Sequence, residues 1–171
     1  MGTVEKLFLH ESLVRVLVLD DNRIGTDAFI NIMHAVRKCT RIHELSFARC
    51  GITIDANEDA AKDLKASMNQ NCSIYKLNLE GNVVHDAVRT DLAAELDKNQ
   101  GIVEKIFPMY EGRGERAIHE LSLAGRGITS LDFLTKFLRE HPQIKRVDLD
   151  IEENVADQEF KKVAEHLRGN T

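Results

Sequence analysis

Three groups of residues have types and spacings that suit chemistry: a glycine-rich segment, a pair of histidines and a run of carboxylates. The glycine-rich segment, residues 112–117, reads Gly-Arg-Gly-Glu-Arg-Ala and matches the loose dinucleotide-binding pattern. That pattern holds a pyrophosphate only where a helix begins directly after the glycines. Here residues 118–123 follow with the apolar spacing of a strand. We therefore expect a flexible turn at 112–117 and no dinucleotide site.

His43 and His119 occupy equivalent places in two copies of the sequence Ile-His-Glu-Leu-Ser. Neither histidine has a second ligand at the helical spacing that a zinc protease requires. Repetition of a structural segment produces such pairs without any chemical cause. We therefore expect both histidines at the surface or at a strand edge.

The carboxylates match part of a calcium-binding loop. Positions 1, 3, 5 and 12 of that loop would be Asp148, Asp150, Glu152 and Glu159, but position 6, which requires glycine, holds Glu153. We expect a solvated acidic face here and assign no metal ligand. Because no nucleophile is paired with a base anywhere in the chain, the sequence predicts no enzyme, no catalytic residue and no cofactor.

Composition limits the remaining classes. The 171 residues are 43% hydrophobic and 30% charged, with a net charge of -5, which fits one soluble domain. The longest apolar stretches are too short for a membrane span, and the negative charge disfavours nucleic acid. The amino terminus shows no secretory signal, and Cys39, Cys50 and Cys72 have no metal-ligand spacing. These features favour a cytoplasmic protein.

An internal repeat of the form L-x-x-L-x-L-x-x-N-x-I organises the chain. Clear copies begin at Val14, Ile42 and Ile74, a fourth begins at Ile118, and a degenerate fifth begins at Ile144. The polar position of the repeat is held by Asn22, Cys50 and Asn82 in the first three copies, where we expect bonds to the backbone of adjacent turns.

Apolar residues at helical spacing follow each of the first three copies, so each unit is a strand followed by a helix. Leu17 and Leu45 are 28 residues apart, and Leu45 and Leu77 are 32 apart. Strands joined by helices in this way pair in parallel with right-handed crossovers. The sequence therefore predicts an α/β fold: a right-handed solenoid of strand-helix repeats with a curved parallel sheet.

The stretch from Leu17 to Val36, together with Leu77 to Leu96, resembles the ribonuclease-inhibitor-like class of leucine-rich repeats. That class includes ribonuclease inhibitor, the Ran GTPase-activating protein, tropomodulin and NOD-like receptors. The resemblance covers almost the whole chain and implies a fold, but no particular activity.

We expect a single leucine-rich repeat domain over 1–171, with five parts. Residues 1–12 would be a partial repeat or a helical cap, and 13–101 would be three regular repeats. Val103 and Ile106 fall where a further repeat should begin, so a degenerate strand is expected at 103–109, within an irregular helix-less unit at 102–117; an irregular insertion is the alternative. Degenerate repeats would follow at 118–154 and a capping helix at 155–171.

Residues that alternate with the inward leucines would point to the concave side of the sheet. We expect a partner to bind there and at the irregular 103–116 segment, where exposed apolar side chains are typical interface anchors. The alternative is that these apolar side chains are core. The candidate residues are Val16, Val18, Asp20, Glu44, Ser46, Lys76, Asn78, Glu80, Phe107, Met109, Tyr110, Glu120, Ser122, Arg146, Asp148 and Asp150.

The function favoured by the sequence is a non-enzymatic scaffold that binds another protein. One alternative is a GTPase-activating-type regulator, with Arg113 as its first candidate residue. Another is an actin-capping module, because 106–116 loosely resembles the end of the tropomodulin repeat domain. We expect a monomer, or weak self-association through the first strand; a part of a longer solenoid is the alternative to a capped chain.

Overall fold

The structure is a computed structural model that describes residues 14–109, 119–124, 126, 128, 130–149 and 157–169. The chain divides into two compact units, residues 1–100 and 101–171. The repeats predict one continuous domain, whereas each unit has its own parallel strands. No helix in the described ranges is both long and apolar enough to cross a membrane.

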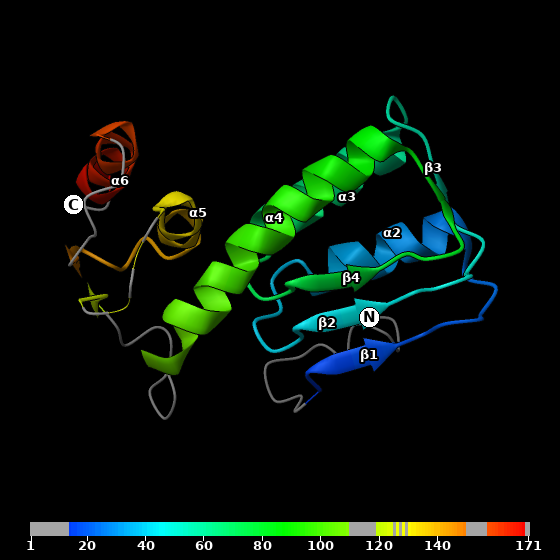
Figure 1. Cartoon of the computed structure of the whole chain (residues 1–171), viewed down its shortest axis with the longest axis horizontal. Helices are drawn as coiled ribbons and strands as arrows, with labels where there is room; N and C mark the ends of the chain where they lie inside the picture. Colours follow the sequence, from blue (N-terminus) through cyan, green and yellow to red (C-terminus); the bar gives the residue numbers. More distant parts are fainter. Residues whose placement is uncertain are drawn as a thin grey trace. The chain divides into compact units, whose positions relative to one another are not determined.

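The first unit contains a three-stranded parallel sheet in the order β1-β2-β4 (Figure 1). Leu17, Leu45 and Leu77 are aligned across the sheet, as the repeat predicts. A second parallel pair, β3 with β5, follows the strand ends. The strands are β1 (Val16–Val18), β2 (Glu44–Ser46), β3 (Thr53–Ile54), β4 (Lys76–Asn78) and β5 (Val83–Val84).

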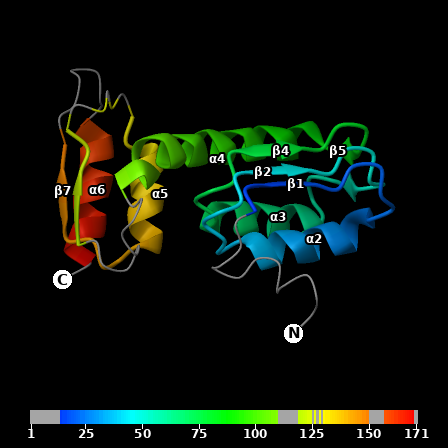
Figure 2. The ribbon, with the colours of Figure 1, turned by 90° about the horizontal axis from the view of Figure 1, so that it is seen from below.

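The described part of this unit also contains three helices, each following a strand: α2 (Gly25–Val36), α3 (Asp59–Gln70) and α4 (Asp86–Lys105), the last of which runs on past residue 100. Their apolar residues recur at helical spacing and are buried, as Phe29, Met33 and Leu64 illustrate. The rings of Phe29 and Phe47 meet edge to face with centroids 5.1 Å apart. Figure 2 shows α2 and α3 on the same side of the sheet.

Side chains at the strand ends join adjacent repeats, and this prediction is confirmed for Asn82 and Cys50. Asn82 Oδ1 accepts the backbone N–H groups of Cys50 and Ile52, each at 3.0 Å, while its Nδ2 donates to Phe47 O at 2.7 Å. The thiol of Cys50 donates to Leu19 O at 3.1 Å, one repeat earlier. The side-chain amide of Asn22 donates within its own turn, to Leu19 O at 2.9 Å and to Asp20 O at 3.0 Å.

The second unit also alternates strands and helices. Leu121 and Val147 are aligned in a parallel two-stranded sheet, and Leu134, Phe137 and Ile144 are buried in its core. The helix expected near the carboxyl end is present. The elements are the 3-10 helix η1 (Phe107–Met109), β6 (Glu120–Ser122), α5 (Asp132–Glu140), β7 (Arg146–Asp148) and α6 (Asp157–Gly169).

The strand expected at 103–109 and the helix-less unit at 102–117 are wrong as far as the described residues reach. Helix α4 continues to Lys105, and residues 107–109 form η1. Asn99, Ile102 and Ile106 are all fully buried, which is the i, i+3, i+7 spacing of a helix face. Pro108, which has no backbone N–H to donate, lies in η1, after the end of α4.

The predicted α/β class with parallel strand-helix units is confirmed, but one continuous curved sheet is not seen. The described strands form three separate small parallel sheets. The expected partial repeat at 1–12 and most of the 110–117 segment lie outside the described residues.

Candidate functional site

One side of the β1-β2-β4 sheet is the best candidate for a binding surface. Helices α2 and α3 lie on the other side (Figure 2), and the candidate side faces the viewer in Figure 1. We call it the open face. It brings together eight of the predicted residues: Val16, Val18, Asp20, Glu44, Ser46, Lys76, Asn78 and Glu80.

A chain of hydrogen bonds crosses the open face from β1 to β4. The hydroxyl of Ser46 donates to Asp20 Oδ1 at 2.6 Å and accepts from Asn78 Nδ2 at 2.9 Å. The backbone N–H of Ala48 donates to the same Asp20 oxygen at 2.8 Å. Each polar group therefore holds its neighbour in place, so this surface would lose little conformational entropy on binding.

Two ion pairs flank this chain of hydrogen bonds. Lys76 Nζ lies 2.9 Å from Glu44 Oε2, and this bond raises the pKa of Lys76 above its ordinary value. Arg49, at the end of β2, bonds both carboxylate oxygens of Asp21 at 2.6 and 2.8 Å, which lowers the pKa of Asp21. Lys76, Arg49 and Asp21 are more than half exposed and Glu44 is partly exposed, so the two pairs orient side chains more than they stabilise the fold.

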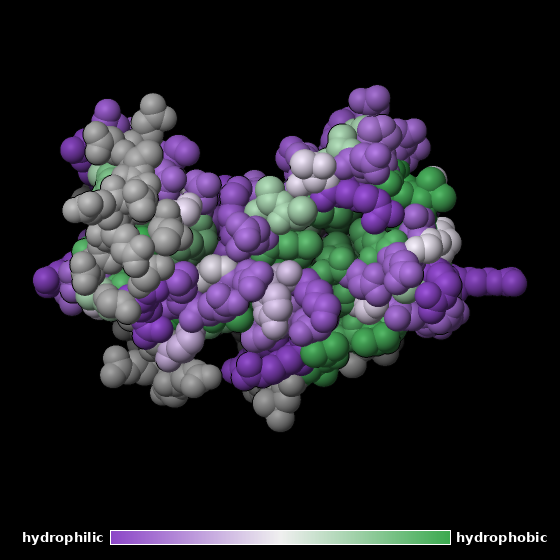
Figure 3. Space-filling model, viewed as in Figure 1, coloured by the Kyte–Doolittle hydropathy of each residue, from purple (hydrophilic) through white to green (hydrophobic). Residues whose placement is uncertain are grey.

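The β1 edge of the open face is apolar. Val16 is 54% exposed and Val18 is 60% exposed, whereas the aligned residues on β2 and β4 are polar. In Figure 3, hydrophobic atoms gather over β1 beside hydrophilic ones. An apolar strip next to oriented polar groups is the usual composition of a protein-binding surface.

His43 lies at the amino-terminal end of β2, 5.8 Å from the ring of Tyr75. Burial and the nearby charge of Arg15 lower the pKa of His43, so its ring is neutral at neutral pH. Among the residues that the structure describes, no three His, Cys, Asp or Glu side chains gather where they could hold a metal ion.

The carboxylates of the calcium-loop pattern have other partners where they are described. Glu159 Oε2 accepts the backbone N–H of Leu131 at the start of α5, together with the hydroxyl of Ser130 at 3.4 Å. Asp148 accepts a bond from Ser122 at 3.2 Å. Asp150 and Glu152 lie outside the described residues.

The other predicted site residues do not lie on the open face. Glu120, Ser122, Arg146 and Asp148 belong to the separate β6-β7 sheet of the second unit. Phe107, which was expected on a strand, is half-buried in η1, and Met109 ends the same short helix. Tyr110 and Arg113 lie outside the described residues.

Sequence reasoning missed a second set of joining side chains, at the helix ends. Asn71 follows α3 and is 1% exposed; its Nδ2 donates to Val36 O at 2.9 Å and to Cys39 O at 3.1 Å. Its Oδ1 accepts the N–H groups of Ser73 and Ile74 at 2.9 and 2.7 Å. The contact between Asn71 and Cys39 had one signal in the sequence. The two residues are 32 positions apart, the same interval that separates β2 from β4.

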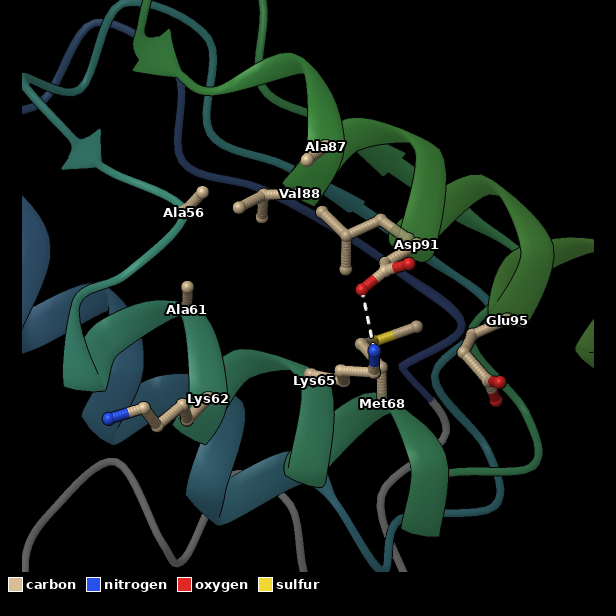
Figure 4. Close-up of a pocket in the computed structure, with 10 residues that line it drawn as sticks. Ala56, Ala61, Lys62, Lys65, Met68, Ala87, Val88, Asp91 and Glu95 are labelled. Atoms are coloured by element: carbon tan, nitrogen blue, oxygen red, sulfur yellow. Dashed lines mark hydrogen bonds and ion pairs between the residues drawn. The ribbon is translucent and has the colours of Figure 1, made fainter.

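A hollow of about 210 Å³ lies between α3 and α4 (Figure 4), and no sequence pattern indicated it. Its apolar lining comes from Ala56, Ala61, Met68, Ala87, Val88 and Leu92. Lys65 Nζ crosses it to Asp91 Oδ2 at 2.6 Å, and this ion pair raises the pKa of Lys65. A lysine held in its protonated form is not a nucleophile, so the hollow offers space without a reactive group.

Parallel strands, intervening helices and joining asparagines in the first unit fit a leucine-rich-repeat-type fold. No family model matches the chain, and no curated protein matches it. The tropomodulin C-terminal domain of Caenorhabditis elegans aligns with 98% of this chain and 90% of its own, at 13% identity and a TM-score of 0.40. The structure titled Leiomodin-1 Actin-Binding Site 2 aligns with 98% and 84%, at 14% identity and a TM-score of 0.39. Likeness at this level assigns no function.

Proposed function

We propose that the protein is a non-enzymatic module that binds another protein through the open face. The observation that carries the proposal is the position of exposed Val16 and Val18 beside polar groups that three strands hold in fixed places. A partner would bury the two valines and exchange hydrogen bonds with groups that are already oriented. The binding free energy would come mainly from the apolar strip, and the polar groups would set the specificity.

The proposal also includes the class of repeat and the cellular location. Strand-helix units of 28 and 32 residues, together with the Asn82 and Cys50 bonds between repeats, support the ribonuclease-inhibitor-like repeat class. A cytoplasmic location is supported by Cys39, Cys50 and Cys72, which are all free thiols.

A crosslinking pull-down from cell lysate tests the proposal. The unmodified chain is compared with the double variant Val16→Glu, Val18→Glu, which places two charges on the strip. The matched control is Val83→Glu, because Val83 on β5 is 69% exposed and lies outside the open face. Circular dichroism first establishes that all three chains keep the same secondary structure.

We expect a protein partner to be captured by the unmodified chain and by the Val83 variant but not by the double variant. Equal capture by all three chains would remove the open face as the binding surface. Binding of the partner is then measured with the purified proteins for Ser46→Ala. This change interrupts the bonds to Asp20 and Asn78 and should weaken affinity by about tenfold or less.

A further inference from the structure

The outer edge of β1 is a second feature of the first unit, distinct from the open face. In the order β1-β2-β4, β1 is a terminal strand, and no described strand pairs with its outer edge. A terminal strand presents backbone N–H and C=O groups that can pair with another chain. Natural proteins often place lysine or proline on such an edge, but β1 has the sequence Val-Leu-Val.

The backbone bonds show which groups face outward. Arg15 O accepts from His43 and Glu44, and the N–H of Leu19 donates to Ser46 O, so residues 15 and 19 face β2. Because successive residues of a strand direct their backbone groups to opposite sides, those of Val16 and Val18 face the outer edge. The same two residues carry the exposed apolar side chains.

We infer that this edge pairs with β1 of a second copy of the chain in antiparallel orientation, which joins two three-stranded sheets into one. With Leu17 at the two-fold axis, Val16 of each copy lies opposite Val18 of the other. Each valine gains an apolar cross-strand neighbour. The inference concerns self-association and does not depend on the proposed binding of another protein.

The charges around β1 favour a second copy and favour the antiparallel direction. Arg15 precedes the strand, and Asp20 and Asp21 follow it. An antiparallel pair brings Arg15 of each copy toward Asp20 and Asp21 of the other, twice in a symmetric interface; within their own chain these aspartates bond Ser46 and Arg49. A parallel pair would place like charges side by side.

The extent of the contact sets the expected strength. A pairing limited to residues 14–20 of each chain buries far less than the about 1,600 Å² of a typical stable complex. We therefore expect a weak dimer that forms as the concentration rises. In that dimer four valines would lie at the centre of a joined open face.

Sedimentation velocity over a hundredfold range of concentration tests the inference. The expected result is a shift from monomer toward dimer, accompanied by slower amide hydrogen exchange at Val16 and Val18 at the higher concentrations. Val18→Pro removes one outward N–H without removing a bond to β2, and should weaken the dimer by about tenfold or more. Arg15→Glu should weaken it by about tenfold through repulsion of the aspartates.

Val16→Lys is a second test in case the proline variant fails to fold. A charged residue blocks edge pairing without constraining the backbone. Val83→Lys is the matched control and should leave association unchanged. A chain that stays monomeric throughout the range overturns the inference. So does a dimer that persists in both Val18→Pro and Val16→Lys. Loss of the dimer with retained partner capture by Val18→Pro would separate this edge from the proposed function.

Discussion

The sequence His-Glu-Leu-Ser occurs in both units, as residues 43–46 and 119–122, and its surroundings differ between them. Glu44 is 2.9 Å from its lysine partner, whereas Glu120 is 3.8 Å from Arg146. Ser46 bonds side chains on both sides, at 2.6 and 2.9 Å, whereas among the described residues Ser122 bonds the side chain of Asp148, at 3.2 Å. The first copy lies on the central strand of three and the second on a strand of a two-stranded sheet. Order in such repeats therefore depends on neighbours on both sides.

The helix ends show the same contrast. Asn71, after α3, bonds to four backbone groups in two neighbouring repeats. His141, in the equivalent place after α5, bonds through Nδ1 to Phe137 O at 2.9 Å and stacks on the ring of Phe137 at 3.9 Å. The side chain of Asn71 thus joins two repeats, whereas that of His141 contacts Phe137 of the preceding helix. We expect substitutions to cost more in the first unit than at matched positions in the second.

The largest difference should come from Asn71→Ala. This change removes the acceptor of the buried backbone N–H groups of Ser73 and Ile74, so we expect a loss of about 2–4 kcal/mol in the stability of the first unit. The matched His141→Ala should cost the second unit about 1 kcal/mol. Native-state hydrogen exchange of residues 42–47 and 144–149 measures the two units separately. Equal costs would show that joining repeats adds no stability.

The strand positions could be predicted because the repeat fixes them directly. Leu17, Leu45 and Leu77 recur at intervals that only a strand followed by a helix can fill, and the structure aligns them. The open face follows from this register, since alternation decides which residues lie opposite the leucines. Whether a partner binds there could not be read from the sequence, because exposure of Val16 and Val18 is compatible with many surfaces.

The region after residue 100 could not be predicted in the same way. Val103 and Ile106 match the strand spacing, but Ile102 and Ile106 equally match one face of a helix. A short apolar segment cannot distinguish the two periods, and here the helix extends an existing one without a new start. The bonds of Asn71 were missed because they depend on two repeats lying side by side, which no local pattern records.

An intermediate difference is expected between Ser46→Ala and Ser122→Ala. The first removes bonds of 2.6 and 2.9 Å from a half-buried position and should cost about 1–2 kcal/mol. The second removes one bond of 3.2 Å at an exposed position and should change stability by less than about 0.5 kcal/mol. The same exchange experiment reports both values. A larger effect at Ser122 would show that two strands suffice to order this face.

The smallest difference between the units is expected in how their stability depends on the protonation of His43 and of His119. Because burial and Arg15 lower the pKa of His43, the folded state binds its proton less tightly than the unfolded state does. The unfolded state therefore gains more protons as the pH falls through the ordinary histidine value of about 6.5. The stability of the first unit should therefore fall as the pH falls, until the pH is below the lowered pKa of His43 in the folded state.

His43→Gln should remove this part of the acid sensitivity, since glutamine cannot be protonated in this range. His119→Gln, made in the same local sequence, is the matched control and should leave the acid sensitivity of the first unit intact. Stability is measured by hydrogen exchange of residues 42–47 at several pH values between about 5 and 8, which span the titration of histidine. If both variants keep the full loss of stability toward acid, His43 is not its cause, and the carboxylates of the open face become the groups to test.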